Sequence, residues 1–194
     1  MAIKAKEEEF IEKYRVANPK ERFGIMINNY AVFPKMIRKA EKKIRYMIIM
    51  EREYLRSKAR GELGVRVQGS GPSNMTADDA IMNSYLDDAL MTGEITRGLL
   101  KGLENAGRYE SDIRTLAIMR MDYDLLKEVV EELDEKDLHI ITKYLLEGKY
   151  IKEIADEEGR TPDAIKKRIR KIRFGLCEEM LECLEMNNRK GKKK

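Results

Sequence analysis

Residues Leu133–Leu176 have the sequence LDEKDLHIITKYLLEGKYIKEIADEEGRTPDAIKKRIRKIRFGL. Apolar residues recur here at spacings of three and four, which predicts helices, and two glycines interrupt the pattern. Gly148 and Gly159 can adopt the left-handed backbone conformation that commonly ends a helix. The segment is therefore predicted to form three helices joined by two tight turns.

The third of these helices is predicted to begin at Thr161. Its side chain can cap the helix by accepting a hydrogen bond from an exposed backbone N–H, and Pro162 suits a first turn that needs no donor. Asp163 places a negative charge beside the positive end of the helix dipole. The predicted inward face of this helix consists of Ile165, Ile169, Ile172 and Leu176.

The two preceding helices are predicted to support the third. The first covers Asp134–Glu147 and the second covers Tyr150–Glu158. Ala155 is small, as required where two helices approach closely at their crossing. The predicted inward residues are Leu138, Ile141, Leu145 and Leu146 in the first helix and Ile151, Ile154 and Ala155 in the second.

The outer face of the third helix is strongly basic. Seven Lys or Arg side chains lie between Arg160 and Arg173, against the single acid Asp163. A helix of this charge, placed after a helix-turn-helix, is expected to lie against phosphates and to present side chains to the major groove of DNA. Arg168 and Lys171 are expected to serve the DNA backbone or neighbouring acids such as Glu157. The predicted DNA-binding residues are Arg160, Thr161, Asp163, Lys166, Lys167, Arg170, Lys171 and Arg173.

Two of these roles stay open at the level of sequence. Lys166, Lys167 and Arg170 are candidates for contacts with guanine or with phosphate, because arginine can grip guanine O6 and N7 together whereas lysine is more often a point charge. Asp163 could accept a hydrogen bond from a cytosine amine, and capping of the helix explains it equally well. An ordinary charged helix is the alternative explanation for the whole set.

This segment resembles the promoter-binding region 4 of bacterial sigma-70-type factors. The family pattern has counterparts in Leu133–Glu135, Leu146–Gly148, Tyr150–Ala155 and Thr161–Arg170, although Glu153 and Ile154 follow Tyr150 by one residue more than in the family. The resemblance covers about a quarter of the chain. It implies a helix-turn-helix that binds double-stranded DNA.

The whole chain resembles, more loosely, late-gene transcriptional activators of phages of Gram-positive bacteria, of the ArpU/RinA type. The shared plan is a charged helical N-terminal part, a loop similar to Val65–Ser70, and acidic helices before a sigma-like domain. The first 130 residues do not resemble the sigma region that melts promoter DNA. The resemblance therefore implies a regulator, with RNA polymerase as a candidate partner, and not a complete sigma factor.

Composition predicts an all-α protein with helical N-terminal and central segments before the C-terminal helix-turn-helix. The five predicted segments are a basic helical region (1–60), a Gly-rich loop or linker (61–75), an acidic helical region (76–132), the DNA-binding domain (133–186) and a basic tail (187–194). The net charge is +8 for residues 1–60, −8 for residues 61–136 and +4 for residues 137–194. Basic ends around an acidic middle fit a nucleic-acid binder whose central part packs against its own basic elements.

The upstream helices are predicted from their apolar spacing. A long basic helix extends from Pro34 to Arg60, and its exposed cations form either a solvated face or a second contact with DNA backbone or a partner. The acidic region is predicted to contain three helical pieces. The first piece is capped at Thr76, and its inward residues are Ile81, Tyr85 and Ala89. The second piece contains Ile95, Leu99, Leu100 and Leu103. The third piece is capped at Ser111, and its inward residues are Ile113, Leu116, Ala117, Tyr123, Leu126, Val130 and Leu133.

Several function classes are disfavoured. The single histidine, His139, has no carboxylate constellation around it, so neither catalysis nor a cofactor or metal is expected. Cys177 and Cys183 point to different helix faces and are expected to be free thiols. The chain has no apolar run long enough to span a membrane, and it begins without a signal-peptide core, so a cytoplasmic location in a bacterial host cell is expected.

Two alternatives stand beside the regulator. One is the small subunit of a phage packaging terminase, which also joins a helix-turn-helix to helical oligomerisation segments. The other is a protein-interaction module that binds RNA polymerase without binding DNA. The regulator is expected to act as a homo-oligomer, and Leu176, Met180, Leu181 and Leu184 could extend the third helix into a packing or dimer contact.

Overall fold

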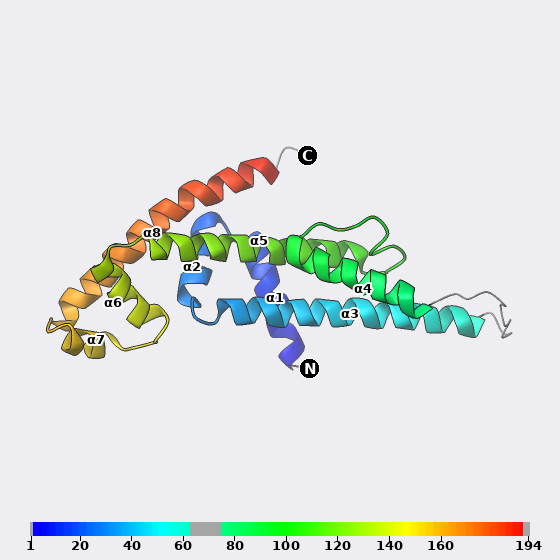
Figure 1. Ribbon diagram of the computed structural model, residues 1–194, viewed down its shortest axis with the longest axis horizontal. Coiled ribbons are helices and arrows are strands. Elements are labelled where there is room, and N and C mark those ends of the chain that lie inside the picture. Colours follow the sequence, from blue (N-terminus) through cyan, green and yellow to red (C-terminus); the bar gives the residue numbers. More distant parts are fainter. Residues whose placement is uncertain (1, 63–74, 192–194) are drawn as a thin grey trace. The chain divides into compact units, whose positions relative to one another are not determined.

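The computed structural model describes residues 2–62 and 75–191, and these residues form eight α-helices and no strand (Figure 1). The all-α prediction is confirmed. Most of the Gly-rich segment, including Val65–Ser70, lies outside the described residues, as does the end of the basic tail. The helices are α1 (Ala2–Val16), α2 (Pro19–Asn28), α3 (Phe33–Glu62), α4 (Met75–Thr92), α5 (Ala106–Glu131), α6 (Glu135–Leu145), α7 (Ile151–Glu157) and α8 (Pro162–Gly191).

The chain forms two compact units that interleave along the sequence. Unit 1 consists of Met1–Glu12 and Met36–Ile118, and unit 2 consists of Lys13–Lys35 and Met119–Lys194. Helices α1, α3 and α5 each contribute one part to unit 1 and the other part to unit 2. Neither unit is therefore a single continuous segment of sequence.

In unit 1, α3 presents an apolar face to α4 and to the first half of α5, which lie alongside it (Figure 1). Ion pairs join the helices at the edges of this core, between Arg45 and Asp87 at 2.7 Å and between Arg56 and Asp79. The buried residues of α3 in this unit are Ile37, Ala40, Ile44 and Ile48. The predicted long basic helix is thus confirmed.

The predicted inward face of α4 is only partly correct. Ala89 is buried, but Ile81 is 51 % exposed and Tyr85 is 41 % exposed. The helix instead buries Leu86 and Leu90 together with Ala89. The inward face is therefore rotated about the helix axis relative to the predicted face.

Residues 93–105 are turns and not the predicted second helical piece. Gly93, Gly98 and Gly102 have positive φ angles of 78°, 97° and 83°, which a right-handed helix cannot contain. The leucines of this segment, Leu99, Leu100 and Leu103, are nevertheless buried. Helix α5 begins directly after these turns, so Ser111 lies inside it and does not cap it.

A carboxylate of α3 holds the end of this turn segment. Glu51 accepts hydrogen bonds from the backbone N–H of Glu104 at 2.6 Å and of Asn105 at 3.2 Å, and from the Tyr109 hydroxyl at 2.6 Å. Burial acts to raise the pKa of Glu51, but these hydrogen bonds together outweigh it and lower that pKa. Glu51 thus fixes the backbone of the two residues that precede α5.

In unit 2, aromatic side chains surround a buried carboxylate. The Tyr14 hydroxyl donates a hydrogen bond to Asp122 at 2.7 Å, and the guanidinium of Arg22 lies 5.4 Å from the centre of the Tyr14 ring. Phe33 stacks on Tyr123, with ring centres 5.4 Å apart. Burial raises the pKa of both Tyr14 and Asp122.

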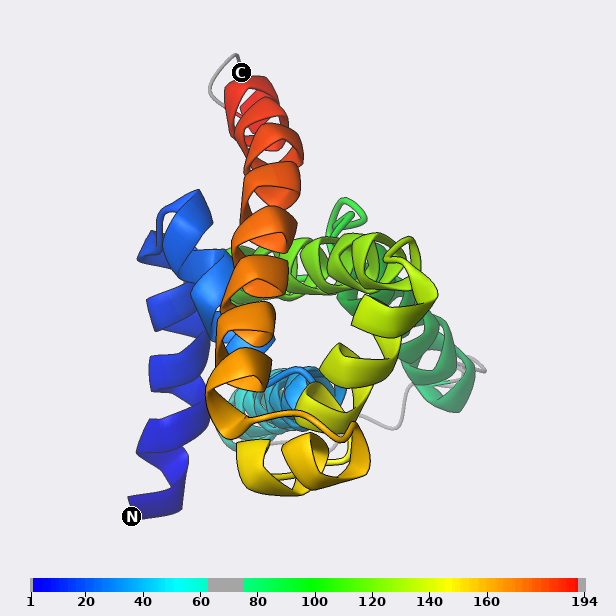
Figure 2. The same cartoon turned by 90° about the vertical axis from the view of Figure 1, so that its left-hand side faces the viewer.

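Helices α6, α7 and α8 pack against one another in unit 2, and α2 packs against α8 (Figure 2). Gly148 and Gly159 have φ angles of 66° and 60°, which confirms the two predicted turns. The inward face of α6 differs from its prediction, because Ile140 and Ile141 are buried whereas Leu146 is 53 % exposed. Leu138, Leu145 and Ile151 are only half-buried.

No helix in residues 2–62 and 75–191 is both long enough and apolar enough to cross a membrane.

Candidate nucleic-acid interface

Helix α8 begins as its sequence predicts. The Thr161 hydroxyl accepts a hydrogen bond from the backbone N–H of Ala164 at 3.3 Å, and Pro162 is the first helical residue. Asp163 is exposed in the first turn. The turn before the helix is closed by the Arg160 backbone N–H, which donates to the carbonyl of Ala155 at 2.9 Å. The start of α8 is therefore fixed by local hydrogen bonds.

Beyond this start, α8 has one buried face and one exposed basic face. Ile165, Ile169, Ile172 and Leu176 are each at most 4 % exposed, as predicted. In the described part of the chain, no acidic side chain pairs with any of the exposed cations. These exposed cations are Arg160, Lys166, Lys167, Arg170 and Lys171.

Arg168 lies on the flank of α8 and is directed toward α6. Its guanidinium pairs with Asp137 and lies 3.6 Å from a carboxylate oxygen of Asp134. The hydrogen bond that Arg168 donates to Asp137 is the main reason that the pKa of Arg168 is raised. An acidic partner for Arg168 is therefore present, but it is not Glu157, the acid suggested by the sequence.

Arg173 is also engaged within unit 2. Its guanidinium donates a hydrogen bond to the side-chain oxygen of Asn28 on α2 at 2.7 Å, and the residue is half-buried. It lies at the edge of a groove of about 770 Å³ between the α2–α3 turn and the α6–α7 turn. The structure therefore separates Arg173 from the other predicted site residues, which are exposed.

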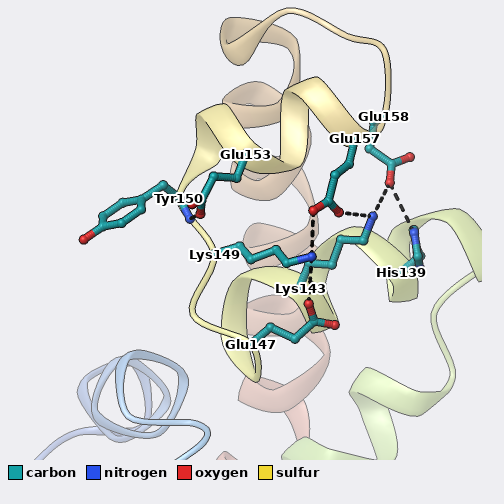
Figure 3. A network of polar contacts seen from close by, with 8 residues as sticks. All are labelled: His139, Lys143, Glu147, Lys149, Tyr150, Glu153, Glu157 and Glu158. Carbon is teal, nitrogen blue, oxygen red and sulfur yellow. Dashed lines mark hydrogen bonds and ion pairs between the residues drawn. The ribbon is translucent and has the colours of Figure 1, made fainter.

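A network of charged side chains fixes α7 on α6 (Figure 3). The Lys143 ammonium contacts Glu158 at 2.8 Å and Glu157 at 2.9 Å. Lys149 contacts Glu157 at 2.7 Å and Glu147 at 3.1 Å. Hydrogen bonds from Lys149 and Lys143 lower the pKa of Glu157 to about 2.

The single histidine belongs to the edge of this network. His139 is 58 % exposed, and its Nε2 atom lies 3.2 Å from Glu158 (Figure 3). The side chain of Tyr150 points away from the network, and its backbone N–H donates to Glu153 at 2.7 Å. Both thiols are half-buried and free, and burial raises the pKa of Cys177.

Phe174 is an exposed residue of α8 that was not predicted as part of the site. It lies one helical turn beyond Arg170 and is 65 % exposed. A helix turns by about 100° per residue, which places Phe174 in line with Lys167 and Arg170. The sequence could have indicated this exposure, because Phe174 is apolar but does not follow the spacing of the inward residues Ile165, Ile169 and Ile172.

The arrangement is suited to binding a polyanion, because five uncompensated cations lie beside a helix start and opposite a buried apolar face. No protein-family model, curated protein or solved structure matches the chain.

Proposed function

We propose that the protein is a sequence-specific DNA-binding transcriptional regulator in which α7, the Gly159 turn and α8 form a helix-turn-helix. The observation that carries this proposal is the exposed basic face of α8, which no acid of the described chain compensates. Helix α8 is the recognition helix, and its N-terminal half enters the major groove.

The dimensions of α8 support this docking. An α-helix with its side chains is about 10–12 Å across, and the major groove is about 12 Å wide. Residues near the N-terminus of a recognition helix contact base edges. Lys166, Lys167 and Arg170 lie in the first three turns of α8, Arg160 lies two residues before its first residue, and Lys171 follows Arg170.

The internal ion pairs support one orientation of docking. Arg168 is neutralised by Asp134 and Asp137, and Arg173 is bonded to Asn28. Arg168 on the side of α6 and Arg173 on the side of α2 therefore contribute little attraction for phosphate. The attraction comes from the exposed cations Arg160, Lys166, Lys167, Arg170 and Lys171.

The regulatory role rests on the sigma-like sequence pattern of residues 133–176. In this proposal α8 places the protein at a promoter, and another surface of the chain contacts RNA polymerase or a second copy. Activation of late genes is the specific role that the sequence resemblance suggests.

Selection from a randomised duplex library, at about 150 mM salt, tests the DNA-binding step. We expect one sequence to be enriched by the full chain and to be lost with Lys166→Ala/Arg170→Ala. The matched control is Lys13→Ala/Lys127→Ala, which removes the same charge from exposed positions outside α8. It is expected to enrich the same sequence as the unmodified chain.

The outcomes separate the candidate functions. Enrichment that survives in Lys166→Ala/Arg170→Ala would contradict docking through α8. No enriched sequence for the unmodified chain would leave the protein-interaction module. An enriched sequence that maps to packaging genes, and not to promoters, would favour the small terminase subunit.

A further inference from the structure

A second basic surface lies on α3, in unit 1. Arg38, Lys39, Lys42 and Tyr46 are all exposed, and Tyr46 is 63 % exposed. At about 100° per residue, the four side chains leave α3 within an arc of about 100°. The buried residues Ile37, Ala40, Ile44 and Ile48 lie on the opposite side of the helix. We call the set Arg38, Lys39, Lys42 and Tyr46 the α3 stripe.

The cations of the α3 stripe differ from Arg45 and Arg52, also on α3, in having no internal role. Arg45 pairs with Asp87 at 2.7 Å, and Arg52 donates to the carbonyl of Leu99 at 2.7 Å. In the described residues, no acid pairs with Arg38, Lys39 or Lys42. Folding of unit 1 therefore accounts for Arg45 and Arg52 and leaves the charge of the α3 stripe unexplained.

We propose that the α3 stripe binds the phosphate backbone of duplex DNA, as a contact separate from that of α8. This inference rests on the proposed DNA-binding function. The stripe is about 12 Å long at 1.5 Å per residue, and one DNA strand has a phosphate about every 3.4 Å along the helix axis. The length of the stripe therefore corresponds to three or four phosphates.

The composition of the α3 stripe favours a phosphate backbone over an acidic protein. Protein interfaces have cores depleted in charged residues and rich in apolar contacts, whereas three of the four stripe residues are cations. Lysine acts as a point charge on phosphate, and a tyrosine hydroxyl is among the donors that commonly bond phosphate oxygens. Such contacts position a protein on DNA without reading its sequence.

The test is the salt dependence of binding of the full chain to a labelled duplex, followed by fluorescence anisotropy. Each phosphate contact contributes about 0.9 to the slope of log affinity against log salt. We expect Arg38→Ala/Lys39→Ala/Lys42→Ala to reduce the slope by about 2–3. The control Lys13→Ala/Lys58→Ala/Lys101→Ala, with the same change of net charge at scattered exposed positions, is expected to reduce the slope by less than about 1.

A second variant tests the tyrosine separately. Tyr46→Phe removes a hydroxyl and no charge, so it is expected to weaken binding by about 2- to 10-fold while leaving the salt slope unchanged. Circular dichroism checks that the triple variant is folded. If it is not, Arg38→Gln/Lys39→Gln/Lys42→Gln replaces it, because glutamine retains the length of the side chain.

The outcomes distinguish this inference from the proposed function. Equal slopes for the triple variant and its control, in a chain that binds DNA, would overturn the α3 contact alone. A chain that binds no duplex at low salt would overturn both. A reduced slope together with an unchanged preferred sequence would support a backbone contact, while loss of that preference is expected only for Lys166→Ala/Arg170→Ala.

Discussion

At the scale of the residue, the lysines of unit 2 divide into structural and available ones. Lys143 and Lys149 hold α7 on α6 through Glu157, whereas Lys166 and Lys167 have no acidic partner within the described residues. All four lysines belong to one short stretch of sequence. Their roles differ because only the first two point toward acids of neighbouring turns.

The low pKa of Glu157 gives a pH dependence with a definite sign. Its pKa falls from 4.5 to about 2 in the folded chain, so its contribution to stability is complete above pH 4.5 and is lost as pH falls toward 2. We expect Glu157→Gln to be less stable than the unmodified chain at pH 7 and to lose less stability on acidification. Urea unfolding at a series of pH values measures both effects.

Glu132→Gln is the control for this experiment, because it removes an exposed carboxylate of unit 2 that lies outside the network. It should follow the pH dependence of the unmodified chain. Parallel stability curves for Glu157→Gln and the unmodified chain between pH 5 and 2 would be inconsistent with the network.

At the scale of the element, the backbone conformation of the segment between α4 and α5 depends on glycines, and these glycines differ in how closely other atoms surround them. Gly93 follows α4 directly, and a Cβ atom at this position would lie 2.7 Å from the Cβ of Ala117 on α5. Gly102 also has a positive φ, but no atom lies within 4 Å of its hypothetical Cβ. Close approach of the chain to α5 therefore requires glycine only at Gly93.

Gly93→Ala is expected to destabilise the protein more than Gly102→Ala. Both substitutions place a side chain in the left-handed region, at a cost of about 1–2 kcal/mol. Only Gly93→Ala adds a steric overlap, for which overpacking of a core costs about 1–3 kcal/mol more. Urea unfolding measures the difference, and equal losses of stability would show that the overlap relaxes without cost.

At the scale of the whole molecule, the alternating charge of the sequence is partly used in folding. The basic α3 and the acidic α4 are joined by the pairs Arg45–Asp87 and Arg56–Asp79 in unit 1. Among the cations that remain exposed, two groups lie on α8 and on the α3 stripe. The small net charge of +4 therefore understates the positive charge that a polyanion would meet at these two surfaces.

Arg170→Ala tests how the exposed charge of α8 is used by the full chain. If Arg170 contacts a base, we expect a loss of about 1–3 kcal/mol at one base pair and relaxed specificity there. If it contacts only phosphate, the salt slope should fall by about one, with a similar loss on every sequence. Anisotropy titrations against the selected duplex and its single-base variants distinguish these results, with Lys20→Ala as the control.

An unchanged affinity and an unchanged slope for Arg170→Ala would contradict a role for this residue in DNA binding.

Signals close together in the sequence predicted the three helices α6 to α8 and their two turns, but not the inward face of α6. Gly148, Gly159 and Thr161 act on their own turns, so their neighbours are sufficient to identify them. The segment 93–105 was mistaken for a helix because its leucines have helical spacing, whereas the positive φ angles of its glycines decide the backbone. Spacing alone cannot show which side of α4 is covered, so the inward face was placed at Ile81 and Tyr85.

Contacts between distant parts of the sequence could not be predicted in this way. Asn28 and Arg173 are 145 residues apart, and Tyr14 and Asp122 are 108 residues apart. Nothing in either local sequence marks these pairs. The candidate face of α8 was identified from the density of its charge, but only the structure shows that Arg168 and Arg173 are bound internally.

The pairing of Arg168 with Asp134 and Asp137 makes the distribution of net positive charge around α8 asymmetric. One flank of α8 carries cations together with their counter-ions, and the other carries cations alone. A polyanion at a distance comparable with the Debye length, about 8 Å at physiological salt, would exert a torque on such a distribution. In the proposed DNA-binding role, this torque would turn the cations that lack counter-ions toward DNA before the first contact forms, which would shorten the search for a productive encounter.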